Sequence, residues 1–233
     1  MLTKYPFQEL GHANHGWLDS HFHFSFAEYY NPKRMHFGVL RVVNDDLIAP
    51  QTGFDLHGHR DMEILSYIIR GELTHGDSMG HQETLHAGEA QYMSAGSGVE
   101  HSEHNFGTSE GRFLQIWVLP DKHGVTPQYG DLRIPFDVRV DQWFHLVSPQ
   151  PEAAPITMHQ DVNMHVLYLH AGNQATYEVA PGRQAYVIQI EGDALINEQV
   201  SLSHGDGLEV IETDLTYKAQ TDCHVFVIEM AKR

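Results

Sequence analysis

The chain has 233 residues, of which 41% are hydrophobic and 19% are charged, a composition typical of a folded globular protein. Its 14 Lys and Arg against 31 Asp and Glu give a formal net charge of −17, which disfavours direct binding to a nucleic-acid backbone. The single cysteine, Cys223, excludes an intrachain disulfide and every zinc site built on cysteine pairs.

The sequence carries no signal for secretion or membrane insertion. Its first residues, MLTKYPFQELGHANHGW, lack an apolar signal region, and no later apolar run is long enough to cross a bilayer. We therefore expect a cytoplasmic protein without a membrane partner. The unusual feature of the composition is the presence of 19 histidines, and the functional argument depends on them.

Short apolar runs follow one another from residue 38 onward. Val, Ile, Leu and aromatic residues are grouped into runs that Gly, Asp, Asn and Pro interrupt at intervals of roughly ten residues. The clearest runs lie at 38–50, 63–77, 83–96 and 112–120. No stretch keeps a helical hydrophobic period long enough for a long helix. The pattern predicts an all-β protein of antiparallel strands in a sandwich or barrel.

Two halves of the chain share a weak repeat. Residues 67–90 align with residues 187–210, each an apolar strand, a glycine, a hairpin and a strand closed by a second glycine. The segment 119–136 between them loses its periodicity and contains three prolines, which is typical of a linker. We predict two tandem β-barrel domains, at 1–125 and 135–233.

Two pairs of metal-ligand residue types in the first half are the main candidates for a metal site. His57 and His59 are two residues apart, so on a strand both side chains lie on one face within reach of a single ion. His101 and Glu103 form a second pair with the same spacing, after a glycine-rich turn. A metal site that draws on both pairs is the main functional hypothesis.

The residues around these pairs resemble the cupin superfamily. Gly53, His57, His59, Glu63 and Gly71 are similar to the first cupin motif, and the run from Gly88 through Gly96 and His101 to Asn105 is similar to the second. The strings HGWLDSHFHFSFAEYYNP, HGHRDMEILSYIIRGELTHGDSMG and SAGSGVEHSEHN resemble the bacterial pirin branch of that superfamily more closely. The resemblance is strong over the first 120 residues and implies a bicupin, with two tandem cupin-type barrels and no metal histidines in the second.

The resemblance also implies a ligand set. Pirins bind one metal through three histidines and one glutamate, which here are His57, His59, His101 and Glu103. The wider cupin pattern takes the carboxylate of its first motif instead, which would be Glu63. Glu103 is the preferred ligand because it shares the face of His101, and Glu63 is then expected to orient a ligand histidine from outside the coordination sphere.

The resemblance implies an oxidoreductase. Three imidazoles and a carboxylate suit one divalent transition ion, with iron as the first expectation and copper, nickel, manganese or zinc as alternatives. Bacterial pirins imply a dioxygenase that opens flavonols such as quercetin, with the flavonol and dioxygen as partners and Glu103 or Glu63 as the proton acceptor. The alternative is a redox-responsive regulator whose metal changes the affinity of the protein for a partner protein.

The remaining histidines carry no metal prediction. His75, His81 and His86 are expected to be solvated near a hairpin, and His21 and His23 to lie on a strand with one aromatic face. The second half contains no pair of histidines at a spacing of two, so a second metal site is not expected. Cys223 is predicted to be a small buried side chain rather than a nucleophile.

Overall fold

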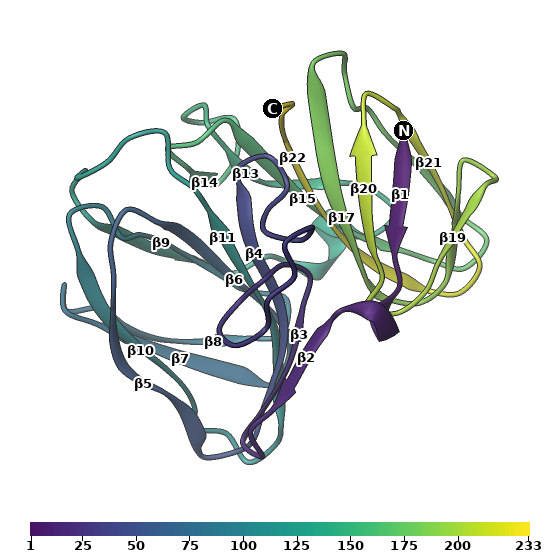
Figure 1. The fold of residues 1–233 in the computed structure, drawn as a ribbon. Coiled ribbons are helices and arrows are strands. Elements are labelled where there is room, and N and C mark those ends of the chain that lie inside the picture. Colours follow the sequence, from purple (N-terminus) through teal and green to yellow (C-terminus); the bar gives the residue numbers. More distant parts are fainter. The chain divides into compact units, whose positions relative to one another are not determined.

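A computed structural model describes the whole chain, Met1–Arg233 (Figure 1). Its regular secondary structure is almost entirely β-strand. The helical segments are two short 3-10 turns, η1 (Phe7–Glu9) and η2 (Phe136–Arg139). Neither has the length or apolar character that a membrane-spanning helix requires. The prediction of an all-β protein is confirmed.

The chain divides into two compact units, which we call the N-terminal unit (11–134) and the C-terminal unit (1–10 with 135–233). The N-terminal unit contains a larger sheet of seven strands and a smaller sheet of four. The larger sheet has the order β12 (Gln128–Leu132), β9 (Ala90–Ser94), β6 (Glu63–Arg70), β11 (Gly111–Val118), β4 (Leu40–Ile48), β3 (Leu18–Phe22), β2 (Gly11–Asn14). The smaller has the order β5 (Thr52–His59), β10 (Val99–Asn105), β7 (Glu72–Asp77), β8 (Gln82–His86).

The C-terminal unit is built in the same way. Its larger sheet has the order β1 (Leu2–Tyr5), β20 (Gly207–Ile211), β17 (Arg183–Glu191), β22 (Cys223–Ala231), β15 (Val162–Leu169), β13 (Phe144–Ser148), β14 (Ile156–Thr157). Its smaller sheet has the order β16 (Gln174–Tyr177), β21 (Leu215–Ala219), β18 (Ala194–Ile196), β19 (Val200–Leu202).

The two units repeat one topology. Every strand of one unit has a counterpart at the same place in the other, for example β6 and β17, β11 and β22, or β10 and β21. The turns that follow β6 and β17 contain Gly71 at φ 75° and Gly192 at φ 80°, a left-handed conformation that glycine adopts at little cost. The repeat predicted at 67–90 and 187–210 therefore corresponds to matching strands.

The predicted barrels are seen only in part. Neighbouring strands are antiparallel in every sheet except for the parallel pair of β13 and β14. Each unit, however, has two separate hydrogen-bonded sheets rather than one ladder closed on itself. The architecture is therefore two pairs of sheets, without the ladder closure that defines a barrel.

Two predicted boundaries need correction. The first predicted domain includes residues 1–10, but the strand Leu2–Tyr5 pairs with Gly207–Ile211 of the C-terminal unit. An ion pair joins the same segments, since Lys4 Nζ lies 2.7 Å from Asp206 Oδ2. The predicted linker 119–136 also contains β12, which adds an edge strand beside β9. Both errors arise because pairing over long sequence separations leaves no local hydrophobic signal.

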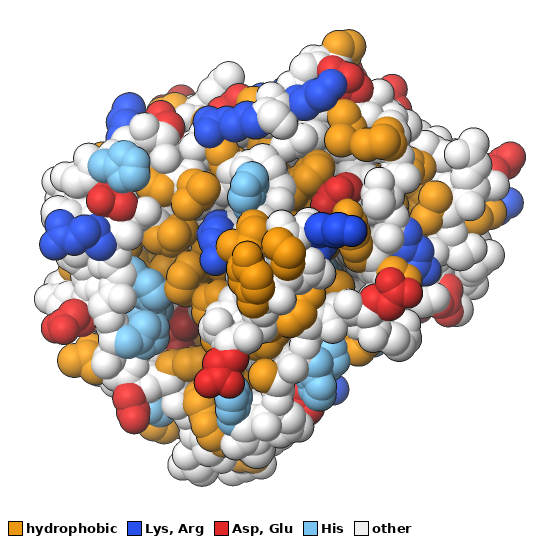
Figure 2. All heavy atoms as spheres, in the orientation of Figure 1, with side chains coloured by type: hydrophobic (Ala, Val, Ile, Leu, Met, Phe, Trp, Pro, Cys, Tyr) orange, Lys and Arg blue, Asp and Glu red, His pale blue; other side chains and the backbone are white.

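Charged side chains of both signs are scattered over the face of the molecule drawn in Figure 2. On the face drawn in Figure 2, Lys and Arg side chains form separate groups among Asp, Glu and uncharged side chains. This face presents no continuous basic surface of the kind that nucleic-acid binding requires.

Removal of residues 1–10 should destabilise the C-terminal unit, because β20 would lose its partner β1. We expect a Tm lower by about 5 °C or more, and faster hydrogen exchange in Gly207–Ile211. Exchange in Gly111–Val118 of the N-terminal unit should be unchanged and serves as the internal control. Unchanged protection of Gly207–Ile211 would contradict the assignment of β1 to this sheet.

Candidate metal centre

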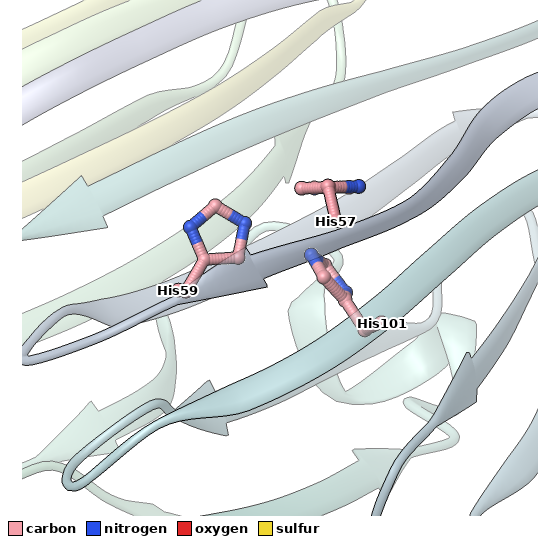
Figure 3. A group of neighbouring side chains, drawn as sticks. All are labelled: His57, His59 and His101. Atoms are coloured by element: carbon pink, nitrogen blue, oxygen red, sulfur yellow. The ribbon is translucent and has the colours of Figure 1, made fainter.

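Three histidines meet across two neighbouring strands. His57 and His59 lie on β5, and His101 on β10 is the direct cross-strand partner of His57. The ring centroids of His57 and His101 are 4.5 Å apart, and each lies 4.9 Å from that of His59. One nitrogen from each ring lies within 4.8 Å of the others, and Figure 3 shows the rings gathered over the two strands.

The free nitrogens of these rings are available as ligands. His57 Nδ1 lies 2.8 Å from the carbonyl oxygen of Asp55, which can only accept, so the neutral ring has its proton on Nδ1 and its lone pair on Nε2. Both ring nitrogens of His101 are buried and have no hydrogen-bond partner in the protein. Such orphaned atoms are costly unless a ligand satisfies them, and an unprotonated imidazole nitrogen is a good ligand for a divalent transition metal.

Burial keeps two of the rings neutral. It lowers the pKa of His59 to about 4 and that of His101 to about 3, and the neighbouring imidazoles of the group act in the same direction. Both rings are therefore neutral at pH 7, which is the form that binds a metal.

Glu103 lies two residues beyond His101 on β10, where it is buried and held by amide groups. Gln91 Nε2 donates to Glu103 Oε1 at 2.6 Å, and Gln115 Nε2 donates to Oε2 at 2.9 Å. The hydroxyl of Ser66 also lies 3.0 Å from Oε1. The carboxylate is thus held in one orientation by side chains from three strands of the larger sheet.

His75 joins Glu103 and His101 in a second group of ligand types. It is directly opposite Glu103 on β7, is completely buried, and stacks on Tyr129 with ring centroids 4.2 Å apart. Its Nε2 lies 3.0 Å from Asp77 Oδ2, which leaves a buried Nδ1 without a partner. The prediction that His75 is solvated is wrong, because β7 lies in the interior beside β10 rather than at the hairpin tip.

A cavity of about 210 Å³ opens beside the histidines. His57, His59 and Glu103 contribute to its wall. Its other lining residues are Phe26, Asn44, Asp46, Phe54, Gln115 and Trp117. The cavity therefore combines the polar group with aromatic walls, as expected for a site that binds a flat polar molecule.

Two polar atoms of this lining have no partner in the protein. Asn44 Oδ1 is a buried acceptor and Trp117 Nε1 is a buried donor, and both lack a hydrogen bond. Since buried polar groups are almost always paired, these atoms are suited to bind a hydroxyl or carbonyl group of a ligand.

Asp46 is the titratable group of the cavity that the sequence analysis missed. Burial raises its pKa to about 7, against the opposing effect of a hydrogen bond from the Ser20 hydroxyl, and the charges of Asp45 and Glu103 raise it further. A carboxyl group with this pKa can accept or release a proton near neutral pH.

Glu63 is hydrogen-bonded to the neighbouring strand of the larger sheet. Its carboxylate accepts hydrogen bonds from Tyr92 and Ser94, which oppose β6 on the neighbouring strand β9. Ser66, three positions along β6, contacts Glu103, and odd and even positions of a strand point to opposite faces. Because β5 ends at His59 and the chain enters another sheet at Glu63, the expected role of Glu63 beside a ligand histidine stays a prediction.

A further group of ligand types lies outside this site. His12, Asp19 and His21 bring ligand atoms within 4.8 Å of one another near the β2–β3 hairpin. The rings of His12 and His21 are stacked 4.5 Å apart, and His12 Nε2 already lies 2.7 Å from Asp19 Oδ1. The group is self-paired and partly solvated, in contrast to the buried and unpaired nitrogens of His101.

Cys223 is buried, as predicted. Its Sγ donates to the carbonyl oxygen of Asp193 at 3.2 Å, and burial raises the pKa of the thiol. Both effects favour the unreactive thiol over the nucleophilic thiolate.

One sequence signal could have identified the missed residues. Asn44, Asp45 and Asp46 interrupt an otherwise apolar strand, and buried polar residues in such a place need partners or a function. Gln115 stands in a similar position between Leu and Ile on β11. The sequence does not reveal which of them face the histidines, because that depends on the pairing of β4 with β11.

The pKa of Asp46 gives a pH-dependent stability. Its folded-state pKa of about 7 exceeds its ordinary value of 3.8, so this carboxyl group favours folding below pH 3.8 and opposes it as the pH rises through 7. Metal-free Asp46→Asn should therefore have a higher Tm than the wild type at pH 8, by about 3 °C or more, and a similar Tm at pH 4.

The control is the neighbouring Asp45→Asn. Asp45 pairs with Arg112 through contacts of 2.8 and 2.6 Å, so its replacement should lower the Tm at pH 8. If both variants were destabilised equally at pH 8, Asp46 would not be an acid with a raised pKa.

Comparison with known proteins agrees with this architecture. A family model described as Pirin matches residues 5–118, and one described as Quercetinase C-terminal cupin domain matches residues 145–230. The chain is 41% identical over 224 residues to a quercetin 2,3-dioxygenase of Escherichia coli, with 95% of each chain covered. It is 38% identical over 233 residues to a pirin-like protein of Caulobacter vibrioides, with 99% of this chain and 100% of that protein covered.

A solved structure gives the same relationship. The bacterial pirin YhhW from Escherichia coli, in complex with nickel(II), is 37% identical and superposes with a TM-score of 0.94 over 100% of both chains. Identity well above 30% over nearly the full length, with matching fold, shows common descent. The chain belongs to the pirin family.

Proposed function

We propose that this protein is a mononuclear metal-dependent dioxygenase that opens the ring of flavonols such as quercetin. The observation that carries the proposal is the aromatic-walled cavity of about 210 Å³ beside three neighbouring imidazoles, of which His101 has two buried nitrogens without partners. The name of the relative from Escherichia coli, a quercetin 2,3-dioxygenase, supports the same activity.

We assign the metal ligands to His57, His59, His101 and Glu103. The three histidines already bring ligand atoms within 4.8 Å of one another, and Glu103 lies within the same distance of His101 in the overlapping group. The donor set of three nitrogens and one oxygen suits a divalent transition metal, with iron first and copper, nickel, manganese or zinc as alternatives. Gln91 and Gln115 orient the carboxylate from behind.

The cavity suits part of a flavonol. Its volume of about 210 Å³ is below the range of ~300–1,000 Å³ of complete ligand pockets, so it would enclose the reacting ring and leave the rest at the opening. Phe26, Phe54 and Trp117 supply flat apolar walls. The unpaired Asn44 Oδ1 and Trp117 Nε1 supply one acceptor and one donor for the hydroxyl and carbonyl groups of the ligand.

The proposed reaction also needs an acceptor for the substrate proton and a cavity that excludes water. When bound, a divalent metal supplies a Lewis acid that lowers the pKa of a coordinated hydroxyl and offers open positions to substrate and dioxygen. Asp46 lines the same cavity and, with a pKa of about 7, can take up the proton of the flavonol 3-hydroxyl. The buried aromatic walls exclude water from the reacting ring.

Glu103→Gln should weaken metal binding by about tenfold or more, because a charged ligand is lost. Glu63→Gln is the matched control, because it makes the same change in another buried carboxylate, that of Glu63 on β6. This variant should retain one metal per chain. Metal content after dialysis and the Tm of each metal-free variant separate loss of a ligand from loss of folding. Loss of metal from Glu63→Gln alone would reverse the assignment.

The protein loaded with Fe(II), Cu(II), Ni(II) or Mn(II) should consume oxygen with quercetin and not with luteolin, which lacks the 3-hydroxyl. Attachment through both the 3-hydroxyl and the 4-carbonyl is needed to orient the ring, so we expect a loss of about 100-fold or more without the hydroxyl. Oxygen uptake in an electrode cell measures both rates, with the His57→Ala, His101→Ala double variant as the metal-free control.

The other outcomes assign other functions. Equal turnover of quercetin and luteolin would indicate metal chemistry outside the cavity. Absence of oxygen uptake with every metal, together with a partner protein whose affinity changes when the bound metal is oxidised, would favour the redox-responsive regulator.

A further inference from the structure

Both ring nitrogens of His101 are buried without a partner, but a single metal ion can bind only one of them. When a neutral imidazole binds an ion through one nitrogen, its other nitrogen carries the proton and needs an acceptor. A buried N–H group is almost always paired with such an acceptor. The proposed metal centre is therefore incomplete until the second nitrogen of His101 has a partner.

The neighbouring ring of His75 has an unused buried nitrogen. Its side chain is completely buried, and its Nδ1 has no hydrogen-bond partner. His75 lies on β7 and His101 on the adjacent β10, with their ring centroids 5.4 Å apart. This separation allows a hydrogen bond of ~3 Å between ring nitrogens that face each other. The two rings are thus close enough to be partners.

Asp77 determines which nitrogen of His75 carries the proton. Asp77 Oδ1 accepts hydrogen bonds from the backbone N–H groups of Met79 and His81, at 2.9 and 3.0 Å. Its Oδ2 lies 3.0 Å from Nε2 of His75. A carboxylate held by such donors is ionised at neutral pH and can only accept. The neutral His75 ring therefore has its proton on Nε2 and its lone pair on Nδ1.

Other acceptors beside His101 are already used. Both oxygens of Glu103 accept hydrogen bonds from glutamine amides, and Glu103 is itself an assigned metal ligand. Asp77 is the direct cross-strand partner of His101, but its two oxygens are occupied by the turn after β7 and by His75. The Nδ1 lone pair of His75 is a buried acceptor that remains available.

Tyr129 covers His75 from the strand β12. The two rings stack with centroids 4.2 Å apart and an angle of 13° between their planes. The Tyr129 hydroxyl donates to Gln91 Oε1 at 3.3 Å, which ties the stack to the side chain that holds Glu103. The stack holds the plane of His75, and its complete burial leaves no room for water to compete for Nδ1. A hydrogen bond in such surroundings is electrostatically stronger than in water.

We propose that His75 and Asp77 are positioning residues of the metal centre. His101 donates the N–H that the metal does not occupy to His75 Nδ1, and His75 donates its Nε2–H to the Asp77 carboxylate. The charge of Asp77 thereby makes the ligand nitrogen of His101 more basic and fixes the orientation of its ring. The inference rests on the metal ligands of the proposed function and is independent of the substrate.

The first test determines the tautomer of His75 in the full-length, metal-free protein by ¹⁵N NMR of labelled histidines. We expect the neutral Nε2–H form at pH 7. In Asp77→Asn, the amide oxygen can still accept from the turn, so the NH₂ group faces His75 and its proton should move to Nδ1. A wild-type His75 with its proton on Nδ1, or with protons on both nitrogens, would overturn the proposal.

The second test measures the affinity for Ni(II) by competition with a chelator. Asp77→Asn should weaken binding by about tenfold or more. Asp206→Asn is the matched control, because Asp206 is also buried and also accepts two backbone N–H groups, those of Phe7 and Ser203. It lies in the C-terminal unit, so this variant should keep the wild-type affinity even if its Tm falls.

Two variants of similar size separate the role of an acceptor from that of packing. His75→Asn retains an oxygen that can accept from His101, whereas His75→Leu retains a similar volume without an acceptor. We expect His75→Leu to bind Ni(II) about tenfold more weakly than the wild type, and His75→Asn to stay within about threefold. Adding Asp77→Asn to His75→Leu should cause no further loss, since Asp77 acts through His75.

The outcomes distinguish this inference from the proposed function. Wild-type affinity in Asp77→Asn, equal affinities of the two His75 variants, or additive losses in the double variant would overturn the inference alone. Failure of the wild type to bind Ni(II) would overturn the ligand assignment and the inference with it. The expected losses of affinity, in a protein that takes up no oxygen with quercetin, would support the inference and contradict the dioxygenase.

Discussion

The position of β10 between β5 and β7 is the constraint on which the site depends. Its hydrogen-bonded register with β5 places His101 opposite His57, and its register with β7 places Glu103 opposite His75. The approach of β5 is close: a Cβ atom on Gly53 would lie 2.4 Å from the carbonyl oxygen of Glu103. Only glycine therefore fits at position 53, and the ligand pairs meet because this side chain is absent.

Several polar groups whose burial costs free energy lie close together at this site. Glu103 is a buried carboxylate, Asp46 is a buried acid whose pKa approaches 7, and His101 has buried nitrogens without partners. The amides of Gln91 and Gln115 offset part of the cost for Glu103. The buried apolar residues of the same unit offset the remaining cost, and a bound metal would relieve the part that concerns His101 and Glu103.

The two units show that one topology can carry different sets of polar side chains. Strand order is the same in both. The first two strands of the smaller sheet carry His57, His59, His101 and Glu103 in one unit, whereas in the other their sequences, QATY and LTYKA, contain no His, Asp, Glu or Cys. In the C-terminal unit, Tyr177 and Tyr217 belong to the hydrophobic cluster. A polar group of that unit lies instead on the larger sheet, where Arg183 and Asn163 donate hydrogen bonds to Glu229.

The sequence by itself determined the class of the fold, the repeat and the first four candidate ligands, because strand periodicity and a spacing of two residues are local properties. It did not determine the partners of β1, the burial of His75, the face of Glu63 or the place of Asp46. Each of these depends on which strand lies beside which, over separations as large as that from Leu2 to Val210. Local spacing fixes which side chains of one strand point together, and only the pairing of distant strands decides what they face.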